Sequence, residues 1–395
     1  MSNNSTETPI APIPNDVMRQ IPSPCYVLEA ERLRSNMRLI RDVQQRSGAK
    51  IILAFKAFAL WDAFPIVREM FTEATASSLS EARLAAEELG SLAYTYAPVY
   101  APSEIDQILA CSTHITFNSL QQLERFTPNV LNADHPVSVG LRVNPEFAQV
   151  ETDLYNPCVP GSRLGIVSSQ LPHELPSIVE GLHFHALCES GADDLVRLLD
   201  AFETRFGHWL KKIKWVNMGG GHLMTRKGYD RELLIDTIKA FRSRHPHLCV
   251  ILEPGSAFAW QTGFLLATVQ DIVENAGIQT AMLNVSFACH MPDCLEMPYK
   301  PAIRGAHHDP VEGLPTYRMG GNSCLSGDYV GSWSFDQPLH VGDNIILEDM
   351  IHYTTVKTTM FNGVTHPSIA IYDPSHGGLR VVRTFTYDDY RSRMG

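Results

Sequence analysis

The chain has 395 residues, 44% of them hydrophobic and 19% charged, and a formal net charge of −11 at pH 7. The length predicts two or three domains, and the composition is that of a globular protein with enough apolar residues for a large core. The negative charge argues against a nucleic-acid partner and weakly favours small cationic ligands. No apolar run approaches the roughly 18 residues of a membrane span, so no membrane partner is expected.

The N-terminus and the cysteines indicate a cytoplasmic protein. Residues 1–20 are polar and proline-rich, with neither a basic start nor an apolar signal core. We therefore expect a disordered or frayed tail that directs no export. The eight cysteines show no C-x-x-C spacing, which favours reduced thiols over a disulfide framework or a zinc site.

The first predicted elements are a strand at 22–28, entered through prolines, and a helix at 29–45. A second strand is predicted at 51–58, a short apolar run with a single lysine, Lys56. A lone ammonium is costly to bury, so Lys56 must be solvated at the strand tip, paired, or used chemically. The plain alternative is a lysine that snorkels at a strand end. The chemical alternative is a Schiff base, because desolvation lowers the pKa of a lysine and frees its amine to attack a carbonyl.

From residue 51 onward, short apolar strands alternate with helices, such as those expected at 80–89 and 231–242. This alternation indicates parallel strands joined by crossover helices. Eight repeats over roughly 200 residues match a closed (β/α)8 TIM-like barrel better than an open doubly wound sheet. The open sheet remains the alternative if the strand count is wrong by one. The expected strands begin near residues 51, 73, 92, 114, 137, 180, 213 and 249.

Beyond residue 261, apolar residues alternate and are interrupted by Gly, Pro, Asp and Asn. This pattern predicts an antiparallel β-sandwich or β-barrel domain, completed by the strand at 22–28. We therefore expect an α/β chain with a tail at 1–20, a barrel at 29–262, and a C-terminal β domain formed by 21–28 and 263–395.

Active sites of such barrels lie at the carboxyl ends of the strands. Polar or charged residues stand at nearly every expected strand end, a concentration that a purely structural role does not require. They are Lys56, Ser77, Ser78, Tyr96, Asn118, Ser119, Arg142, Asn144, His185, Gly219–Gly221, His222 and Glu253.

Two of these strand ends suggest contacts with a ligand. Gly219–Gly221 follow the seventh strand, where backbone N–H groups could close on a phosphate or form a tight turn alone. Glu253 ends the eighth strand. A carboxylate buried there needs a partner, either a protonated ring nitrogen or a structural arginine.

His183 and His185 share one face of the sixth strand, so a metal site must be considered. A metal-dependent hydrolase of barrel fold would need an aspartate at the end of the eighth strand, where this chain has Glu253. We therefore expect no metal, and a histidine that stacks on a flat cofactor or is hydrogen-bonded. In the β domain, Cys324 and Asp328 lie in a glycine-rich polar loop, which indicates a functional loop or an ordinary surface loop.

Taken together, these residues resemble the alanine-racemase-like group of pyridoxal-phosphate enzymes, and within it the decarboxylases. The motifs are the barrel lysine, H-x-x-x-E/S after the sixth strand, Gly-Gly-Gly, Glu-Pro-Gly, C-x-x-G-D and a late tyrosine, spread over residues 22–371. The most similar family is that of the carboxynorspermidine and carboxyspermidine decarboxylases. That likeness rests on AFKAFA, TASSLSEARL, SRLGI, LHFHALCES, NMGGGH, PDCLEMPYKP and CLSGD.

The resemblance implies a set of residues that bind pyridoxal 5'-phosphate. Lys56 would carry the cofactor as a Schiff base, and His185 would stack on the pyridine ring. Glu253 would keep the ring nitrogen protonated. Gly219, Gly220 and Gly221 would cradle the phosphate, and Tyr353 would complete the phosphate pocket.

The resemblance also implies the catalytic residues, Lys56, His185 and Cys324. Loss of CO2 from an α-amino acid leaves a carbanion, for which the protonated pyridinium is an electron sink. Cys324, or the lysine once freed, would return a proton to that carbon. Cys324 and Asp328 would reach the substrate in the site of a partner subunit, which implies a homodimer with shared active sites.

The chain departs from relatives in the wider group at two positions. Ornithine and diaminopimelate decarboxylases carry a phosphate-contacting arginine after Glu-Pro-Gly, where this chain has Ser256. They also carry an acid after the loop cysteine, where this chain has Leu325. The loss of that acid argues against both substrates and moves amine recognition elsewhere. We expect Glu296 first, and Asp293 second, to bind the distal amines of a polyamine.

The resemblance therefore predicts decarboxylation of carboxynorspermidine or carboxyspermidine to norspermidine or spermidine. One alternative is a decarboxylase of another amino acid: diaminopimelate, ornithine, arginine or lysine. A second, of another class, is a non-catalytic pyridoxal-phosphate carrier, which would need neither the β domain nor the Cys324 loop. A metal-dependent hydrolase is the last.

Overall fold

The computed structural model describes residues 10–150 and 155–395. Within them the chain forms two compact units. We call Asn36–Phe258 the barrel unit, and Ala259–Gly395 together with the segment that ends at Ser35 the β unit. Among the described residues, no helix is both long and apolar enough to cross a membrane.

The barrel unit is built on nine parallel strands in the order β2-β10-β9-β8-β7-β6-β5-β4-β3. The two ends of this order, β2 (Lys50–Ile51) and β3 (Leu53–Ala54), are halves of one stretch interrupted only at Ile52. The Ile52 N–H donates to Leu252 O at 3.0 Å, whereas the Leu53 N–H donates to Glu73 O at 3.1 Å. The same stretch thus bonds to both neighbours, and the predicted (β/α)8 barrel is confirmed.

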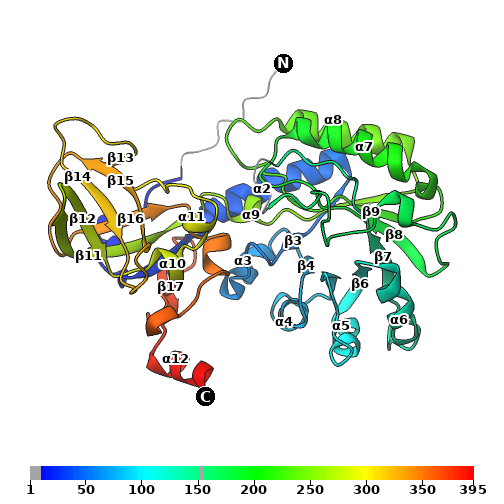
Figure 1. The fold of residues 1–395 in the computed structure, drawn as a ribbon, viewed down its shortest axis with the longest axis horizontal. Coiled ribbons are helices and arrows are strands. Elements are labelled where there is room, and N and C mark those ends of the chain that lie inside the picture. Colours follow the sequence, from blue (N-terminus) through cyan, green and yellow to red (C-terminus); the bar gives the residue numbers. More distant parts are fainter. Residues whose placement is uncertain (1–9, 151–154) are drawn as a thin grey trace. The chain divides into compact units, whose positions relative to one another are not determined.

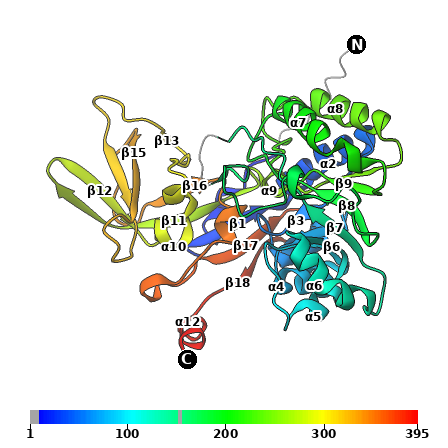
Figure 2. The same cartoon turned by 45° about the vertical axis from the view of Figure 1, so that its right-hand side comes forward.

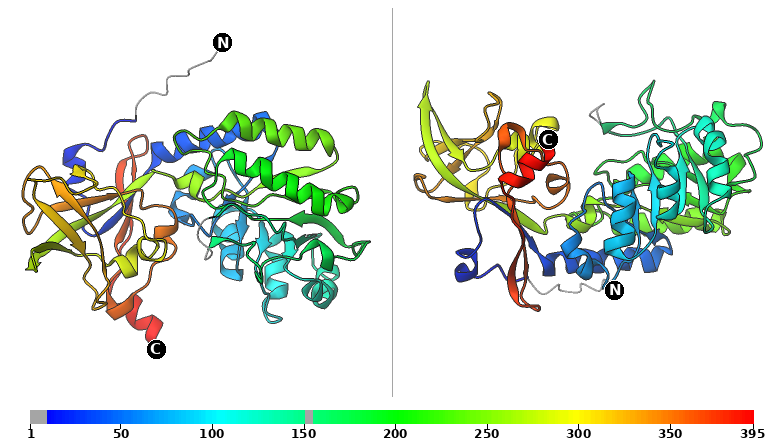
Figure 3. Two further views of the ribbon diagram at one scale, coloured as in Figure 1. Left: turned by 45° about the horizontal axis from the view of Figure 1, so that its top comes forward. Right: turned by 90° about the horizontal axis from the view of Figure 1, so that it is seen from below.

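Helices cover the outside of these strands, as Figures 1 and 3 show for α7 and α8 on one side and α4, α5 and α6 on the other. The remaining strands are β4 (Ala74–Ala76), β5 (Ala93–Tyr96), β6 (Ser112–Phe117), β7 (Ser138–Arg142), β8 (Val179–His183), β9 (Trp215–Asn217) and β10 (Cys249–Leu252). The main helices are α2 (Ala30–Ser47), which begins in the β unit, α3 (Phe64–Val67), α4 (Leu79–Leu84), α5 (Ile105–Ala110), α6 (Leu120–Leu131), α7 (Ala192–Leu210), α8 (Arg231–Arg244) and α9 (Ser256–Ala259).

The strand that carries Lys56 is shorter than the sequence predicts. It ends at Ala54, and the residues that follow form a turn. Phe55, Ala57 and Phe58 are nevertheless fully buried. These positions are buried although they lie beyond the strand, and apolar residues occupy them. The run 51–58 therefore looks like one continuous strand in the sequence.

The interior of the barrel is filled by large side chains. Trp215, at the start of β9, is 4% exposed, and a Cβ added to Gly140 or Gly181 would overlap its ring. Tyr94 and His114 stack with their ring centroids 4.0 Å apart, and His114 meets Trp215 edge to face. The interior of the barrel is therefore a packed core, as is usual for such barrels, and the polar residues lie at the strand ends.

The β unit contains a second nine-stranded sheet, in the order β13-β15-β14-β12-β11-β1-β17-β18, with β16 also paired to β11 (Figure 2). Most pairings are antiparallel, as predicted, but β1 pairs with β17 and β12 with β14 in parallel, so the sheet is mixed. The strands are β1 (Cys25–Glu29), β11 (Gly263–Asn275), β12 (Ile278–Leu283), β13 (Ala306–His307), β14 (Thr316–Gly320), β15 (Tyr329–Phe335), β16 (Asn344–Glu348), β17 (Ser368–Asp373) and β18 (Gly378–Arg383).

The N-terminal strand β1 completes this sheet, because it lies between β11 and β17. Short helices occupy the loops of the unit and carry several of the predicted site residues. They are α1 (Asn15–Met18), α10 (Phe287–His290), α11 (Asp293–Glu296), the 3-10 turns η5 (Tyr353–Thr355) and η6 (Phe361–Gly363), and α12 (Tyr387–Met394).

Candidate active site

Lys56 lies in the turn that follows β3, at the carboxyl end of the barrel strands. The turn is fixed by the Phe55 N–H, which donates to Thr75 O at 3.3 Å, and by the Ala57 N–H, which donates to Ala54 O at 3.2 Å. The backbone on either side is buried, but the Lys56 side chain is exposed. The sequence thus holds the lysine rigidly at its backbone and leaves its amine accessible.

The amine of Lys56 is poised for chemistry by its surroundings. Although the side chain is accessible, the packed strand ends around the amine desolvate it and lower its pKa from 10.5 to about 8; the nearby Arg142 acts in the same direction and the charge of Glu253 opposes the shift. The Nζ atom lies 3.3 Å from Nε2 of His185. A lysine with a lowered pKa has a larger fraction of the neutral, nucleophilic amine at neutral pH.

The ring of His185 has one defined tautomer. Its Nδ1 accepts the Gly220 N–H at 3.1 Å, so Nδ1 carries no proton. Burial lowers the pKa of His185 well below its ordinary value, which leaves a neutral ring with its proton on Nε2. Nε2 can therefore donate to the Lys56 amine once that amine has lost its own extra proton.

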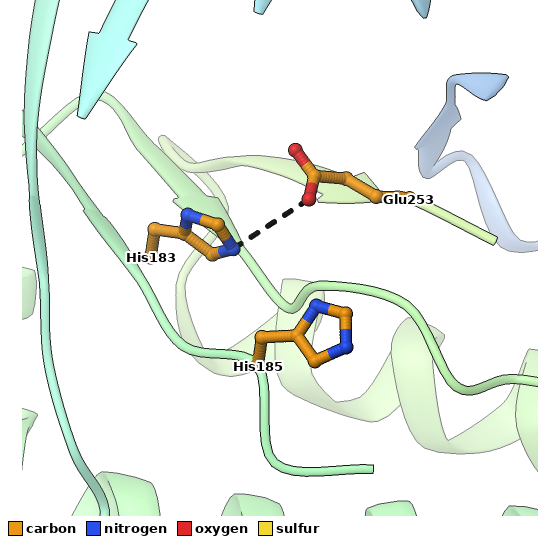
Figure 4. Close-up of side chains that lie close together, drawn as sticks. All are labelled: His183, His185 and Glu253. Carbon is orange, nitrogen blue, oxygen red and sulfur yellow. Dashed lines mark ion pairs between the residues drawn. The ribbon is translucent and has the colours of Figure 1, made fainter. Parts of the chain in front are cut away.

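Glu253 follows β10 and is 5% exposed. Its Oε1 accepts from Asn217 Nδ2 at 2.6 Å, and its Oε2 lies 3.6 Å from His183 Nε2 (Figure 4). Burial raises the pKa of Glu253, and the Asn217 hydrogen bond and the charge of Lys56 oppose that shift. Glu253 is thus a buried carboxylate held by neutral groups and near the active lysine.

His183, His185 and Glu253 also form the one three-residue cluster of possible metal ligands in the described part of the chain, with their ligand atoms within 4.8 Å of one another (Figure 4). Both ring nitrogens of His185, however, already face a partner, Gly220 on one side and Lys56 on the other. A metal ion would have to displace one of these two contacts.

The glycine turn packs tightly between two strand ends. Gly219 and Gly221 have positive φ values of 70° and 87°. A Cβ added to Gly219 would lie 2.7 Å from Phe184 O, and one added to Gly220 would lie 2.5 Å from Glu253 O. Side chains are therefore excluded by both the backbone conformation and the close packing.

Asn217 links the glycine turn to Glu253. Its Oδ1 accepts the Gly219 N–H at 2.9 Å, while its Nδ2 donates to Glu253. The Glu253 N–H in turn donates to Gly219 O at 2.8 Å. No role was predicted for Asn217, although it lies two positions before Gly219 and ends a strand. Its position at a strand end could have indicated that it belongs to the site.

Arg142 is a second buried polar residue for which no role was predicted, and it is 6% exposed at the end of β7. Its guanidinium lies over the Tyr96 ring at 4.6 Å and donates to His185 O at 3.3 Å. Tyr96 meets the His183 ring edge to face at 5.3 Å. These contacts join three of the strand ends listed from sequence into one cluster.

The groups of this cluster fit pyridoxal phosphate in their chemistry. A reactive amine suits its aldehyde, a buried carboxylate suits its ring nitrogen, an imidazole suits its flat ring, and a glycine turn suits its phosphate. The barrel unit brings together Lys56, His185, Gly219–Gly221 and Glu253, as the sequence predicted. The other predicted residues belong to the β unit.

In the β unit, the loop that carries Cys324 is held by hydrogen bonds to Asn362 and Asp328. Cys324 is exposed, and its N–H donates to Asn362 Oδ1 at 2.8 Å. Asp328 is 5% exposed and accepts from the Ala288 N–H at 3.0 Å and from the Ser323 hydroxyl at 2.6 Å. The carboxylate of Asp328 therefore holds the loop in shape, while the thiol of Cys324 stays accessible.

Asp293 and Glu296 lie on α11, and both form an ion pair with Lys357. Lys357 follows Tyr353 closely in the chain, and its own N–H donates to Tyr353 O at 3.1 Å. Lys357 could not be predicted from the sequence, because some sixty residues separate it from the acids and no motif includes it.

A closed (β/α)8 barrel with an active lysine, an imidazole, a carboxylate and a glycine turn at its strand ends, followed by a β unit, defines a pyridoxal-phosphate enzyme of the alanine-racemase-like fold. The sequence matches the family described as "Pyridoxal-dependent decarboxylase, C-terminal sheet domain" over residues 25–351. The chain belongs to this family of pyridoxal-dependent decarboxylases. It is a carboxy-lyase whose cofactor is pyridoxal 5'-phosphate.

Individual relatives extend this match over nearly the whole chain. A carboxyaminopropylagmatine decarboxylase of Synechocystis sp. is 52% identical over 96% of this chain and 97% of its own length. A carboxynorspermidine/carboxyspermidine decarboxylase of Campylobacter jejuni is 42% identical over 95% of this chain and 99% of its own. The crystal structure of carboxynorspermidine decarboxylase with norspermidine, from the same organism, superposes with a TM-score of 0.86 at 41% identity and covers 94% of this chain and all of that one.

Proposed function

We propose that this enzyme removes the carboxyl group of carboxynorspermidine or carboxyspermidine and releases norspermidine or spermidine in polyamine biosynthesis. The observation that carries this proposal is the full-length similarity to the Campylobacter jejuni enzyme, whose structure holds norspermidine. Leu325 supports it, because the acid that ornithine and diaminopimelate decarboxylases carry after the loop cysteine is missing here.

A second candidate substrate is carboxyaminopropylagmatine, which the 52% identical Synechocystis relative is named for. It shares the carboxylated aminopropyl arm with the first two candidates but ends in a guanidinium instead of an ammonium. The reacting end of the site would treat all three alike, so the choice depends on residues that contact the far end of the substrate.

The test is CO2 release by the holoenzyme with seven substrates: carboxynorspermidine, carboxyspermidine, carboxyaminopropylagmatine, diaminopimelate, ornithine, arginine and lysine. We expect kcat/KM for at least one carboxylated polyamine to exceed that for each of the four amino acids by about 1,000-fold, since each of those ends at its first side-chain cation and lacks the terminal cation that lies beyond it in the polyamines. A preference for one of the four amino acids would refute the proposal.

Each predicted site residue receives a role in this reaction. Lys56 would bind the cofactor through Nζ, and His185 would lie against its ring. Glu253 would hold a proton at the ring nitrogen. Pyridoxal phosphate, when bound, supplies an electron sink for the charge left by CO2. The phosphate would rest on Gly219–Gly221 and Tyr353.

Proton return completes the reaction on the substrate carbon. The Cys324 thiol, which is exposed and held by its backbone contact with Asn362, would donate this proton. Lys56 Nζ, whose pKa is lowered to about 8, is the other candidate donor. Glu296 and Asp293 would bind the distal amines of the substrate, and Asp328 would keep the Cys324 loop in place.

The pKa of Lys56 predicts how the apoenzyme captures its cofactor at different pH values. The pKa is lowered from 10.5 to about 8, so the amine gains its proton as the pH falls through about 8. Below that value the neutral fraction falls about tenfold per pH unit. We expect the rate constant of reconstitution, followed by stopped-flow absorbance, to rise up to pH 8 or so and then level off. A rate that keeps rising to about pH 10, the range of an ordinary lysine, would contradict this prediction.

We also propose that the enzyme is a cytoplasmic homodimer in which Cys324 and Asp328 serve the partner's site. All eight cysteines are free thiols, which is typical of a reducing compartment. If the sites are shared, inactive Lys56→Ala and Cys324→Ala chains should complement each other. Random mixing would give one intact site in half of the dimers, about a quarter of wild-type activity. No recovery after subunit exchange, with exchange verified by mass spectrometry, would rule out the shared site.

A further inference from the structure

Lys357 connects two segments of the β unit that the proposed function assigns to different tasks. Its Nζ donates to Asp293 Oδ1 and to Glu296 Oε2, the two acids of α11. Its backbone N–H donates to the carbonyl of Tyr353, in the turn η5 that we assign to the phosphate pocket. One lysine thus ties the candidate amine-binding acids to the segment that carries Tyr353.

The helix α11 has little capacity to orient its acids without this lysine. It has only four residues, and its N-cap, Pro292, makes no side-chain capping hydrogen bond. So short a helix is not stable by itself, and its geometry depends on tertiary contacts. Asp293 and Glu296 are three residues apart, so their carboxylates lie on one face and would repel each other without a cation between them.

The three charged side chains of this cluster, Asp293, Glu296 and Lys357, are partly shielded from solvent, which strengthens the interactions between their charges. The side chains of Asp293, Lys357 and Glu296 are 15%, 31% and 47% exposed. Two carboxylates and one ammonium leave a net charge of −1. Each carboxylate gives one oxygen to Lys357 and retains a second that can accept a hydrogen bond.

We propose that Lys357 is a positioning residue for substrate recognition. It holds the carboxylates of Asp293 and Glu296 in one arrangement and leaves the trio with a single negative charge for the distal cation of the polyamine. This inference rests on the proposed function, and in particular on the assignment of Asp293 and Glu296 to the distal amines. In this role Lys357 acts through these acids.

A purely structural ion pair would behave differently. Its loss would lower stability and impair every substrate alike. A positioning role affects only ligands that carry the distal cation, and it affects binding more than the chemical step, because that end of the substrate does not change in the transition state.

The test compares Lys357→Met with Lys357→Arg in the holoenzyme. Methionine keeps most of the stem and loses the charge, whereas arginine keeps the charge and can pair with both acids. We expect Lys357→Met to raise KM for carboxynorspermidine about tenfold with kcat changed less than about twofold, and Lys357→Arg to restore most of the loss. The inhibition constant of norspermidine should rise with KM, and that of 1,3-diaminopropane, which lacks the distal amine, should not.

Lys300→Met is the matched control. Lys300 is the other lysine of the β unit among the described residues; it also pairs with an acid, Asp309, and its side chain is 18% exposed. The same change of charge in the same unit should leave KM within about twofold of the wild type if the effect is local to α11. An equal rise in KM for both variants would overturn the inference.

The double variant Lys357→Met/Glu296→Gln tests whether the lysine acts through the acid. We expect its KM to be close to that of the more impaired single variant, because both changes remove one interaction. Additive effects, or a single variant Glu296→Gln with unchanged KM, would overturn the inference even if Lys357→Met fails to fold. A wild-type enzyme that decarboxylates no carboxylated polyamine would instead refute the proposed function, and only then would the inference fall with it.

Discussion

Replacement of Lys56 by alanine is expected to abolish turnover, with kcat at least about 1,000-fold lower than in the wild type. The residue is the one amine with a lowered pKa among the described lysines for which a shift is resolved, and its Nζ faces the neutral His185 ring. No other described lysine is placed at a barrel strand end beside Glu253 and the glycine turn. Without it, the cofactor would lose its covalent anchor and the site one of its two candidate proton donors.

The measurement is CO2 release together with the visible absorbance of the purified protein. The wild type should be yellow, and borohydride followed by peptide mass analysis should place the reduced cofactor on Lys56. Lys214→Ala is the control, because Lys214 belongs to the barrel unit and its side chain is 72% exposed in an ion pair with Glu180. If Lys56→Ala retained more than about a tenth of the activity, or borohydride labelled another lysine, the assignment would be wrong.

The barrel and the polar residues at its strand ends could be predicted because the sequence patterns that indicate them are local. Each strand and the polar residue that ends it are adjacent in sequence, and parallel strands bring those ends to one edge. Lys56, His185 and Glu253 therefore needed no knowledge of side-chain packing to be placed together. Even the shortened strand at Lys56 left the position of that lysine unchanged, since the turn begins only after Ala54.

Interactions between distant segments could not be predicted in this way. The parallel pairing of β1 with β17 joins Cys25 to Ser368, and no periodicity distinguishes it from an antiparallel pairing. The ion pairs of Lys357 are of the same kind, because a lysine in a loop gives no indication of which acid it will meet. Asp328, predicted to contact the substrate, also accepts from the Ser323 hydroxyl and from the N–H of Ala288, which is 40 residues away in the chain, and no motif indicates that second contact.

Replacement of Glu253 by glutamine is expected to lower kcat about 100-fold while the protein stays folded and at least as stable. A hydrogen bond to a charged group contributes roughly 1.5–3 kcal/mol, and the loss of about 2.7 kcal/mol from the transition state is a hundredfold in rate. The amide is neutral and nearly the same shape, so it can keep the contact with Asn217 but cannot hold a proton at the ring nitrogen.

Although Glu253→Gln is expected to lower kcat, it is not expected to lower the stability of the apoenzyme. Burial raises the pKa of Glu253 above its unfolded value, so the native state favours the protonated form. Between the unfolded and the folded pKa the native state therefore binds more protons, and stability falls as the pH rises through that interval. Above it the charged carboxylate lowers the stability of the apoenzyme, and glutamine removes that penalty.

Activity and thermal unfolding measured on the same preparations test both expectations. The acid limb of the wild-type kcat profile, where Glu253 gains its proton, should be absent from Glu253→Gln, and the midpoint of thermal unfolding of the apoenzyme should be unchanged or higher. Glu180→Gln, which removes a half-exposed partner of Lys214, should keep both the rate and the acid limb. A Glu253→Gln enzyme that lost activity in parallel with stability would show that the carboxylate only supports the fold. Loss of rate without loss of stability is what distinguishes a carboxylate kept for its charge from one kept for packing.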